Sequence, residues 1–201
     1  MYKMSDKVFE KGQVPEDPKF WDMADYVARE AGKYKVKSVI DVGTGPKGVV
    51  AMHYWDNVQR ITKGYACDVW KIKELPPQWK PLKMNALDLL DEFEPDSVDV
   101  FQAFGFLEHL IREDGLRILE IAEKIARKLV IVSAANCIHG WDGGLPGWDP
   151  DYKVKVDGNP YHRYNSTWHW KQFEELGYES NLEDARAKKT FILESIAWKH
   201  L

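Results

Sequence analysis

Long apolar stretches are missing from this sequence. No run of apolar residues approaches the roughly 18 that a membrane-spanning helix needs. Residues 1–17, which we read as a polar N-terminal arm, contain nothing that resembles the apolar core of a signal peptide. Cysteine is scarce as well, because Cys67 and Cys137 are the only two and lie far apart in the chain. We therefore expect a protein without a disulfide framework, in the reducing environment of the cytoplasm.

An excess of positive charge is also missing. The 201 residues carry a formal net charge of -4, and no amphipathic basic helix is evident. Neither nucleic acid nor a membrane surface is therefore the expected partner. Apolar residues, in contrast, make up 44% of the chain, and tryptophan occurs nine times. This composition predicts one globular domain over residues 1–201.

A glycine-rich turn stands between two apolar segments in the stretch SVIDVGTGPKGVVAM, residues 38–52. Val39 to Val42 is mostly apolar and β-branched, as in a buried strand. Gly43, Gly45 and Gly48 allow a tight turn and a close approach of the backbone to a ligand, and a helix-compatible run follows. The three glycines also satisfy the dinucleotide pattern G-x-G-x-x-G, which several classes of protein share.

The residues just before and within this turn carry a family resemblance. Asp41-Val42-Gly43-Thr44-Gly45 resembles the first motif of class I S-adenosylmethionine-dependent methyltransferases. The chain departs from the fullest pattern at Pro46 and at Lys47, which stands where a third alternating glycine is frequent. Pro46 removes an N–H that could bind a pyrophosphate, so the departure counts more against a dinucleotide. The resemblance implies a doubly wound, Rossmann-like α/β fold with a seven-stranded sheet, mostly parallel with an antiparallel last strand.

The same resemblance implies a set of residues that bind S-adenosylmethionine. Asp68 ends a strand predicted over Ile61 to Cys67, where an acid can accept hydrogen bonds from two ribose hydroxyls. A helix N-cap is the alternative role for this acid. Asn85 replaces the family's adenine-binding Asp, its carbonyl can accept the same proton, and Asp88 is the alternative. The implied cofactor-binding residues are Asp41, Gly43, Thr44, Gly45, Asp68, Val69, Asn85, Ala86 and Phe104, and no metal site is predicted.

A second family-like segment, FGFLEHL at residues 104–110, contains a Leu-Glu-His sequence that is frequent after the fourth strand of these enzymes. His109 is a candidate base on the acceptor side or a structural residue bonded to backbone. His162 is the other candidate base, in a late segment that also resembles the family. Methyl transfer needs mainly orientation of the reactants, so no catalytic residue is assigned beyond these two candidates.

Periodicity and turn residues predict the remaining elements. Asp114 is predicted to cap a helix, and either Ser166 or Thr167 is predicted to cap a later one. The other predicted elements are a helix over Pro18 to Ala31 and strands over Leu82 to Asn85, Val98 to Ala103, Leu129 to Ser133, Tyr178 to Leu182 and Thr190 to Trp198.

The long segment 135–166 mixes tryptophans and tyrosines with scattered aspartates. Together with His109 it is predicted to form the site of a small polar acceptor, such as a metabolite or a glycan. Two alternatives to a methyltransferase stay open at this point. One is a nicotinamide-dependent oxidoreductase, and the other is a catalytically idle, methyltransferase-like subunit that binds a partner.

Overall fold

The computed structural model describes residues 30–44, 55–70, 72, 75–135, 158–180 and 194–201. Several sequence predictions fall outside these ranges. They are the arm 1–17, nearly all of the helix predicted over Pro18 to Ala31, Gly45 and Gly48, residues 136–157 of the long segment, and residues 181–182 and 190–193 of the last two predicted strands.

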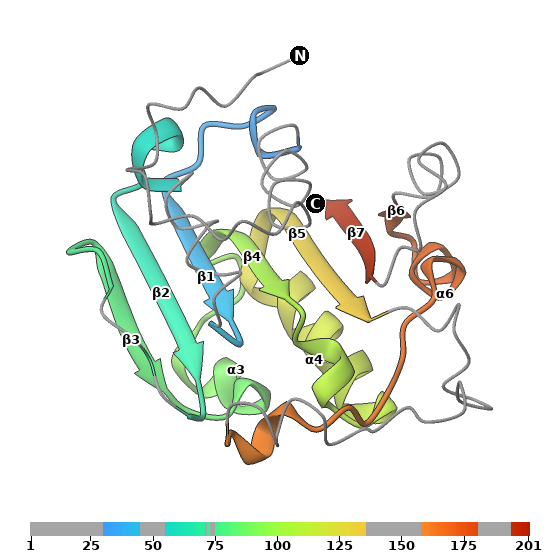
Figure 1. Cartoon of the computed structure of the whole chain (residues 1–201). Coiled ribbons are helices and arrows are strands. Elements are labelled where there is room, and N and C mark those ends of the chain that lie inside the picture. The colour runs from blue at the N-terminus through green and yellow to red at the C-terminus, as the bar shows by residue number, and fades with distance from the viewer. Residues whose placement is uncertain (1–29, 45–54, 71, 73–74, 136–157, 181–193) are drawn as a thin grey trace, which may run out of the picture.

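Seven strands form one sheet in the order β3-β2-β1-β4-β5-β7-β6 (Figure 1). All neighbouring pairs are parallel except those of β7, which runs antiparallel to both β5 and β6. This arrangement confirms the predicted fold class. The strands are β1 (Ser38–Val42), β2 (Lys63–Asp68), β3 (Trp79–Lys83), β4 (Val98–Phe104), β5 (Ala126–Ala135), β6 (Glu179–Ser180) and β7 (Glu194–His200).

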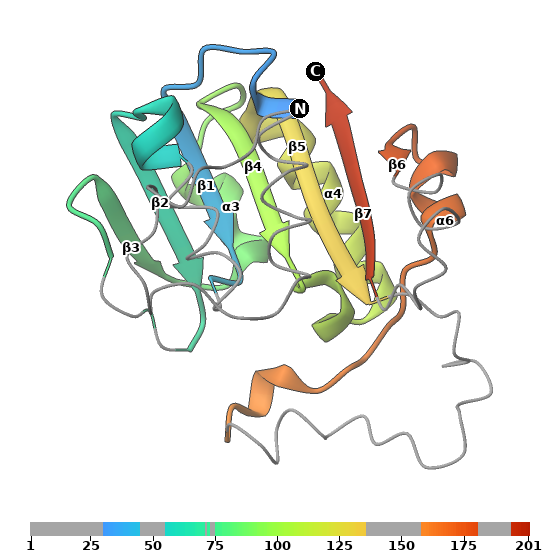
Figure 2. The same ribbon diagram turned by 45° about the horizontal axis from the view of Figure 1, so that its top comes forward.

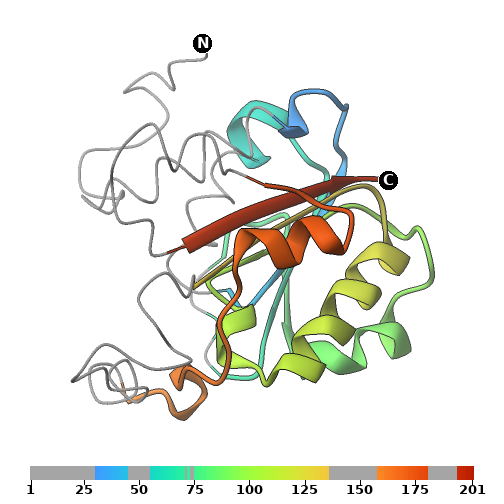
Figure 3. The same ribbon diagram turned by 90° about the vertical axis from the view of Figure 1, so that its right-hand side faces the viewer.

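The central strands are buried on both faces, as their nearly continuous apolar sequences predict. Every residue of β1 and β4 is buried. One face packs against α3 (Leu89–Glu92) and α4 (Arg112–Ile125), which lie together beside the sheet (Figure 3). The opposite face holds a second cluster, which includes Trp55 of the π-helical turn η1 (Trp55–Gln59) and Trp79.

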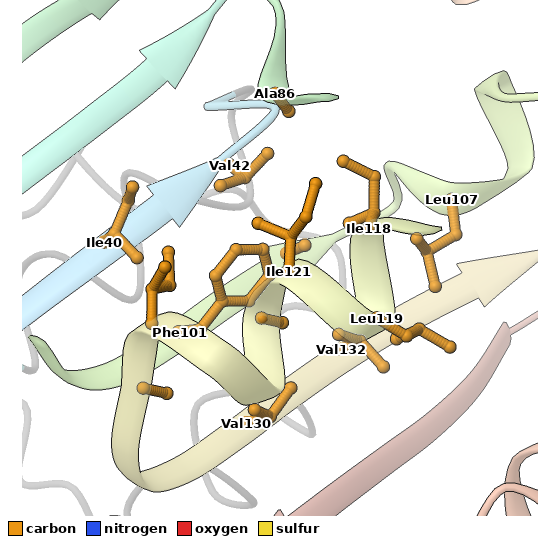
Figure 4. Packing of buried hydrophobic residues seen from close by; sticks show 14 of the residues in the cluster. Ile40, Val42, Ala86, Phe101, Leu107, Ile118, Leu119, Ile121, Val130 and Val132 are labelled. Atoms are coloured by element: carbon orange, nitrogen blue, oxygen red, sulfur yellow. The ribbon is translucent and has the colours of Figure 1, made fainter. Parts of the chain in front are cut away.

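The apolar stripe of α4 forms the centre of the first cluster. Ile118, Ile121 and Ile125 recur at helical spacing and are fully or almost fully buried. Figure 4 shows Ile118 and Ile121 directed at Phe101 of β4 and the neighbouring strands. Burial of each such side chain stabilises the fold by about 1.5–3 kcal/mol. This packing fixes the strand ends that carry the site.

The predicted position of the third strand is wrong by a few residues. The strand was expected over Leu82 to Asn85, whereas β3 begins at Trp79 and ends at Lys83. Pro81 is accommodated because β3 is an edge strand, where one side needs no N–H for pairing. Asn85 instead caps the short 3-10 helix η2 (Ala86–Asp88), since its side-chain oxygen accepts from the N–H of Leu87.

Both predicted helix caps are also wrong. Helix α4 begins before Asp114, which lies in its first turn, where a carboxylate interacts favourably with the helix dipole. The later helix, α6 (Trp170–Glu175), is capped by His169, whose ring accepts from the N–H of Lys171 while Gln172 accepts from the N–H of His169. Ser166 is used elsewhere, because its hydroxyl donates to the carbonyl of Leu107.

The other strand predictions are confirmed with shifted ends. The strand β5 starts directly after α4, and β6 covers Glu179–Ser180 in the described part of its predicted range. The strand β7 is described from Glu194, and it continues past its predicted end at Trp198 to His200. Within the described ranges, no helix is long and apolar enough to cross a membrane.

Candidate functional site

A cavity of about 280 Å³ opens at the carboxyl ends of β1, β2 and β4. This volume is near the lower end of the roughly 300–1,000 Å³ usual for small-molecule sites. Between β1 and β4 the strand order reverses direction along the sheet. Crevices at such switch points are where open α/β sheets bind ligands. The cavity therefore occupies the position in the fold at which a cofactor is expected.

Seven of the sequence-predicted residues meet at this cavity. They come from the turns after four different strands and from one segment much later in the chain. They are Gly43, Asp68, Val69, Asn85, Ala86, His109 and His162. Asp41, Thr44 and Phe104 are buried and do not line the cavity, and Gly45 lies outside the described residues. In place of Phe104, the next residues Gly105 and Phe106 face the cavity.

The turn after β1 requires glycine at its first position. Gly43 has a backbone φ of +68°, a conformation that residues other than glycine rarely adopt. Its N–H donates to the carbonyl of Cys67 at 2.9 Å, which ties the turn to the end of β2. A Cβ atom on Gly43 would collide with the ring of Phe106. The missing side chain of Gly43 lets the ring of Phe106 pack against the turn, and both residues line the cavity.

Asp41 lies directly behind this turn and is 1% exposed. Its Oδ1 accepts from Gln102 Nε2 at 2.7 Å, while its Oδ2 has no hydrogen-bond partner among the described residues. Burial raises the pKa of Asp41 to about 7, against the opposing effect of the Gln102 amide and the nearby Thr44 hydroxyl. A buried carboxyl group in this condition is suited to a cationic partner.

Asp68 ends β2 and is half-buried at the cavity wall. Its Oδ1 accepts from the N–H of Trp70 at 2.7 Å, which forms a local turn. Burial raises the pKa of Asp68, and the hydrogen bond from Trp70 and the nearby His162 oppose this effect. A carboxylate has about four lone-pair sites, so acceptor capacity remains for two hydroxyls.

Asn85 and Ala86 follow β3 and line the same wall. The side-chain oxygen of Asn85 already accepts from Leu87 at 3.1 Å. A carbonyl oxygen has a second lone pair, and the amide also carries two donors. Asp88, the alternative residue for the same contact, is exposed and does not line the cavity. The structure therefore favours Asn85 over Asp88 for any contact with a ligand.

The cavity is covered by residues 158–168, which we call the strap. Figure 2 shows the strap, in orange, crossing below the carboxyl ends of the strands. It is bonded to the 3-10 turn η3 (Leu107–His109). The N–H groups of Asn165 and Ser166 both donate to the carbonyl of Glu108, and the side chain of Asn165 donates to the carbonyl of His109.

The far end of the strap is anchored in the core. Trp168 is fully buried, and the guanidinium of Arg112 lies 4.0 Å above its ring. The indole N–H of Trp168 donates to the hydroxyl of Ser166, and its backbone N–H donates to the carbonyl of Ala135. These bonds make the strap a fixed wall of the cavity, continuous with the sheet.

The two candidate bases are brought together by the strap. The rings of His109 and His162 stack with centroids 5.2 Å apart and an interplanar angle of 27°. Tyr164 packs against His109 at 5.1 Å. Because both histidines also line the cavity, a proton-accepting group stands beside the predicted ligand position.

Sequence reasoning missed Trp55 and Gln102, which hold Asp41 from behind. The indole of Trp55 donates to Gln102 Oε1 at 2.6 Å, and all three side chains are buried. The signal for Gln102 was present in the sequence. It is an amide within the strand VDVFQAF, which is otherwise mostly apolar and buried. Phe106 was also missed as a site residue, because its role depends on the turn at Gly43.

Comparison with solved structures identifies the same fold in methyltransferases. An O-methyltransferase family protein from Burkholderia thailandensis matches 90% of this chain with a TM-score of 0.59 and 14% identity; the chain spans 55% of that protein. A SAM dependent methyltransferase from Archaeoglobus fulgidus matches with a TM-score of 0.54 and 15% identity. The match covers 90% of this chain and 94% of the Archaeoglobus protein. The small RNA methyltransferase HEN1 matches with a TM-score of 0.56 and 13% identity. The match covers 94% of this chain and 26% of the HEN1 chain.

No protein-family model matches the sequence, and no curated protein matches it. At 13% to 15% identity, the structural similarities establish the fold of the chain. The sheet order, the antiparallel β7 and the position of the cavity agree with the motif resemblance of residues 41–45. The chain has the fold of the class I S-adenosylmethionine-dependent methyltransferases.

Proposed function

We propose that this protein transfers the methyl group of S-adenosylmethionine to a small polar acceptor. The observation that carries the proposal is the meeting of Gly43, Asp68 and Asn85, from three different strand ends, at one cavity at the switch point of the sheet. The sequence singled out these residues separately, each for a different part of one ligand. Their convergence supports that ligand.

The donor groups fit the cofactor part by part. The backbone of Gly43 lines the cavity close to Asp41 and suits the amino-acid end, and the carboxylate of Asp68 suits the two ribose hydroxyls. Asn85 and the backbone of Ala86 suit the adenine edge. The strand order also differs from the 3-2-1-4-5-6 order of dinucleotide-binding folds, which weighs against a nicotinamide cofactor.

Bound S-adenosylmethionine supplies an already activated methyl group, so the protein has mainly to orient the acceptor and exclude water. The strap performs the second task by covering the cavity. His109 and His162 lie on the strap side, where an acceptor would enter. In the proposed reaction His109 accepts the proton that the acceptor atom loses as it takes up the methyl group.

The choice of a small acceptor depends on charge. The net charge of -4 provides no general field that would hold a polyanion. Tyr161, on the strap, is 54% exposed, and its ring lies 6.1 Å from that of Trp70. Such aromatic faces beside Asp68 suit a sugar or a cationic metabolite. Because the neighbour named as a small RNA methyltransferase has the same fold, RNA belongs in the test.

The test is calorimetric titration with S-adenosylmethionine, S-adenosylhomocysteine, NAD and NADP, followed by a methyl-transfer assay. The assay panel contains metabolites, glycans and short RNAs. Binding of the first two ligands and transfer to a small molecule are expected. Binding of NAD or NADP alone would overturn the cofactor assignment, and transfer to RNA alone would overturn the acceptor class. Cofactor binding with no transfer to any member of the panel would favour an idle subunit.

A further inference from the structure

Three buried side chains form a hydrogen-bonded chain behind the glycine turn. The indole Nε1 of Trp55 donates to Oε1 of Gln102 at 2.6 Å, and Nε2 of Gln102 donates to Oδ1 of Asp41 at 2.7 Å. Gln102 and Asp41 are paired residues of the adjacent strands β4 and β1. These hydrogen bonds link η1 to Asp41, which directly precedes Val42 of the cavity wall.

The direction of these hydrogen bonds is fixed by Trp55. An indole N–H can only donate, whereas a glutamine amide can present either its oxygen or its nitrogen to a neighbour. Because the oxygen of Gln102 accepts from Trp55, its nitrogen must face Asp41. Asp41 therefore receives a donor on Oδ1, which favours the ionised carboxylate over the neutral acid.

The second oxygen of Asp41 is left for another group. Oδ2 is buried and has no partner within the described part of the chain. A buried carboxylate that is only half satisfied is costly, so a cation at Oδ2 would be bound strongly. The other groups that act on Asp41 are the carboxyl group of Asp68 and the hydroxyl of Thr44, and neither carries a positive charge. None of the described residues that act on Asp41 supplies a cation, so we assign the cation to the ligand.

We propose that Trp55 and Gln102 are positioning residues that orient the Asp41 carboxylate toward the ammonium group of the cofactor's amino-acid end. This inference rests on the proposed function. It assigns a role in cofactor discrimination to two side chains that do not line the cavity. Loss of either side chain should weaken the binding only of ligands that carry the ammonium group.

Two ligands and a matched tryptophan provide the test. S-adenosylhomocysteine has the amino-acid end, and 5′-methylthioadenosine lacks it while keeping the adenosine. The variants are Trp55→Phe, Gln102→Met and, as control, Trp79→Phe. Trp79 is in the same apolar cluster as Trp55, and its indole also donates to a side-chain oxygen, Oδ1 of Asp56, at 2.9 Å. Thermal unfolding of each variant shows whether it is folded.

We expect Trp55→Phe and Gln102→Met each to weaken S-adenosylhomocysteine binding on the order of tenfold and to change 5′-methylthioadenosine binding by less than about twofold. Trp79→Phe should leave the ratio of the two affinities unchanged. An unchanged ratio in the folded Trp55 and Gln102 variants would overturn the inference while the proposed function stands. A wild type that binds neither ligand would overturn both. If Trp55→Phe does not fold, Gln102→Met decides alone.

Discussion

The ring of His109 donates from Nδ1 to the backbone carbonyl of Arg163 across 3.0 Å. A carbonyl oxygen can only accept, so Nδ1 carries the proton and the lone pair of the neutral ring is on Nε2. The strap therefore sets the tautomer of the residue proposed as the base. A histidine held in one tautomer and lining the cavity is prepared to accept a proton from a bound acceptor.

His109→Ala should lower methyl transfer by about 10²-fold or more, because a positioned general base contributes that much. The affinity for S-adenosylhomocysteine should change far less, since Asn165 and Ser166 still bond the strap to backbone carbonyls of η3. Single-turnover kinetics and calorimetry measure the two effects separately. His162→Ala serves as the matched control. If His162→Ala lowers transfer as much as His109→Ala with affinity intact, the proton acceptor is assigned to the wrong ring.

Asp68→Ala should weaken S-adenosylhomocysteine binding by the loss of two charge-assisted hydrogen bonds, each worth about 1.5–3 kcal/mol. Asp68→Asn keeps an oxygen for the N–H of Trp70 and should lose less affinity than Asp68→Ala. The comparison of the two variants separates the ribose contact from the local turn. Asp88→Ala, at an exposed position away from the cavity, is the control. Titrations with the parent ligand and its 2′,3′-dideoxy analogue measure these losses. Asp68 is merely structural if the wild type binds both ligands equally well.

Much of the fold could be predicted because its signals are local. The apolar run from Val39 to Val42 and the helical spacing of Ile118, Leu119 and Ala122 depend only on neighbouring residues. Element ends were less predictable, because caps depend on tertiary contacts. Ser166 had the right chemistry for a cap, but the carbonyl of Leu107, 59 positions away, takes its hydroxyl.

The candidate site could be predicted only on the side that carries motifs. Gly43, Asp68 and Asn85 each lie at or just after a strand end, and strand ends in a parallel sheet share one edge, so their convergence could be predicted from the sequence. The stacking of His162 on His109 could not be predicted, since 53 positions separate the two residues and the strap's docking decides the contact. The link from Trp55 to Asp41 was hidden for the same reason.

Gly115→Ala should loosen the strap from the core. Gly115 lies in α4 under the ring of Trp168, and a Cβ atom there would collide with that ring. Overpacking of this kind costs about 1–3 kcal/mol of unfolding free energy. We expect a lower melting temperature, faster proteolytic cleavage within residues 158–168 and weaker S-adenosylhomocysteine binding.

The control for Gly115→Ala is Glu120→Ala, at an exposed position of the same helix. This change should alter neither cleavage nor binding, because it removes no contact with the strap. Cofactor affinity that stays at the wild-type value in a Gly115→Ala protein with a freely cleaved strap would show that the strap does not contribute to the cofactor site.

Asp41 should make the unliganded protein less stable as the pH rises. Burial raises its pKa from 3.8 to about 7 in the folded state, so between these values the folded protein holds a proton that the unfolded chain releases. Stability must then fall with increasing pH across this interval, by an amount on the order of 4 kcal/mol at 1.36 kcal/mol per pKa unit. The side chain is 1% exposed, so solvent screening does not remove the effect.

Asp41→Asn isolates this contribution, because asparagine resembles the protonated acid and keeps an oxygen for Gln102 Nε2. Its unfolding free energy, measured by urea titration from pH 4 to 8, should decline less than that of the wild type, and above pH 7 the variant should be the more stable protein without ligand. The same substitution should weaken the binding of S-adenosylhomocysteine, because its ammonium group loses the carboxylate partner. The binding of 5′-methylthioadenosine should not change. Parallel stability curves for the two proteins would mean that Asp41 is ionised in the folded state throughout this range. The buried oxygen Oδ2 would then have to be satisfied without help from a ligand.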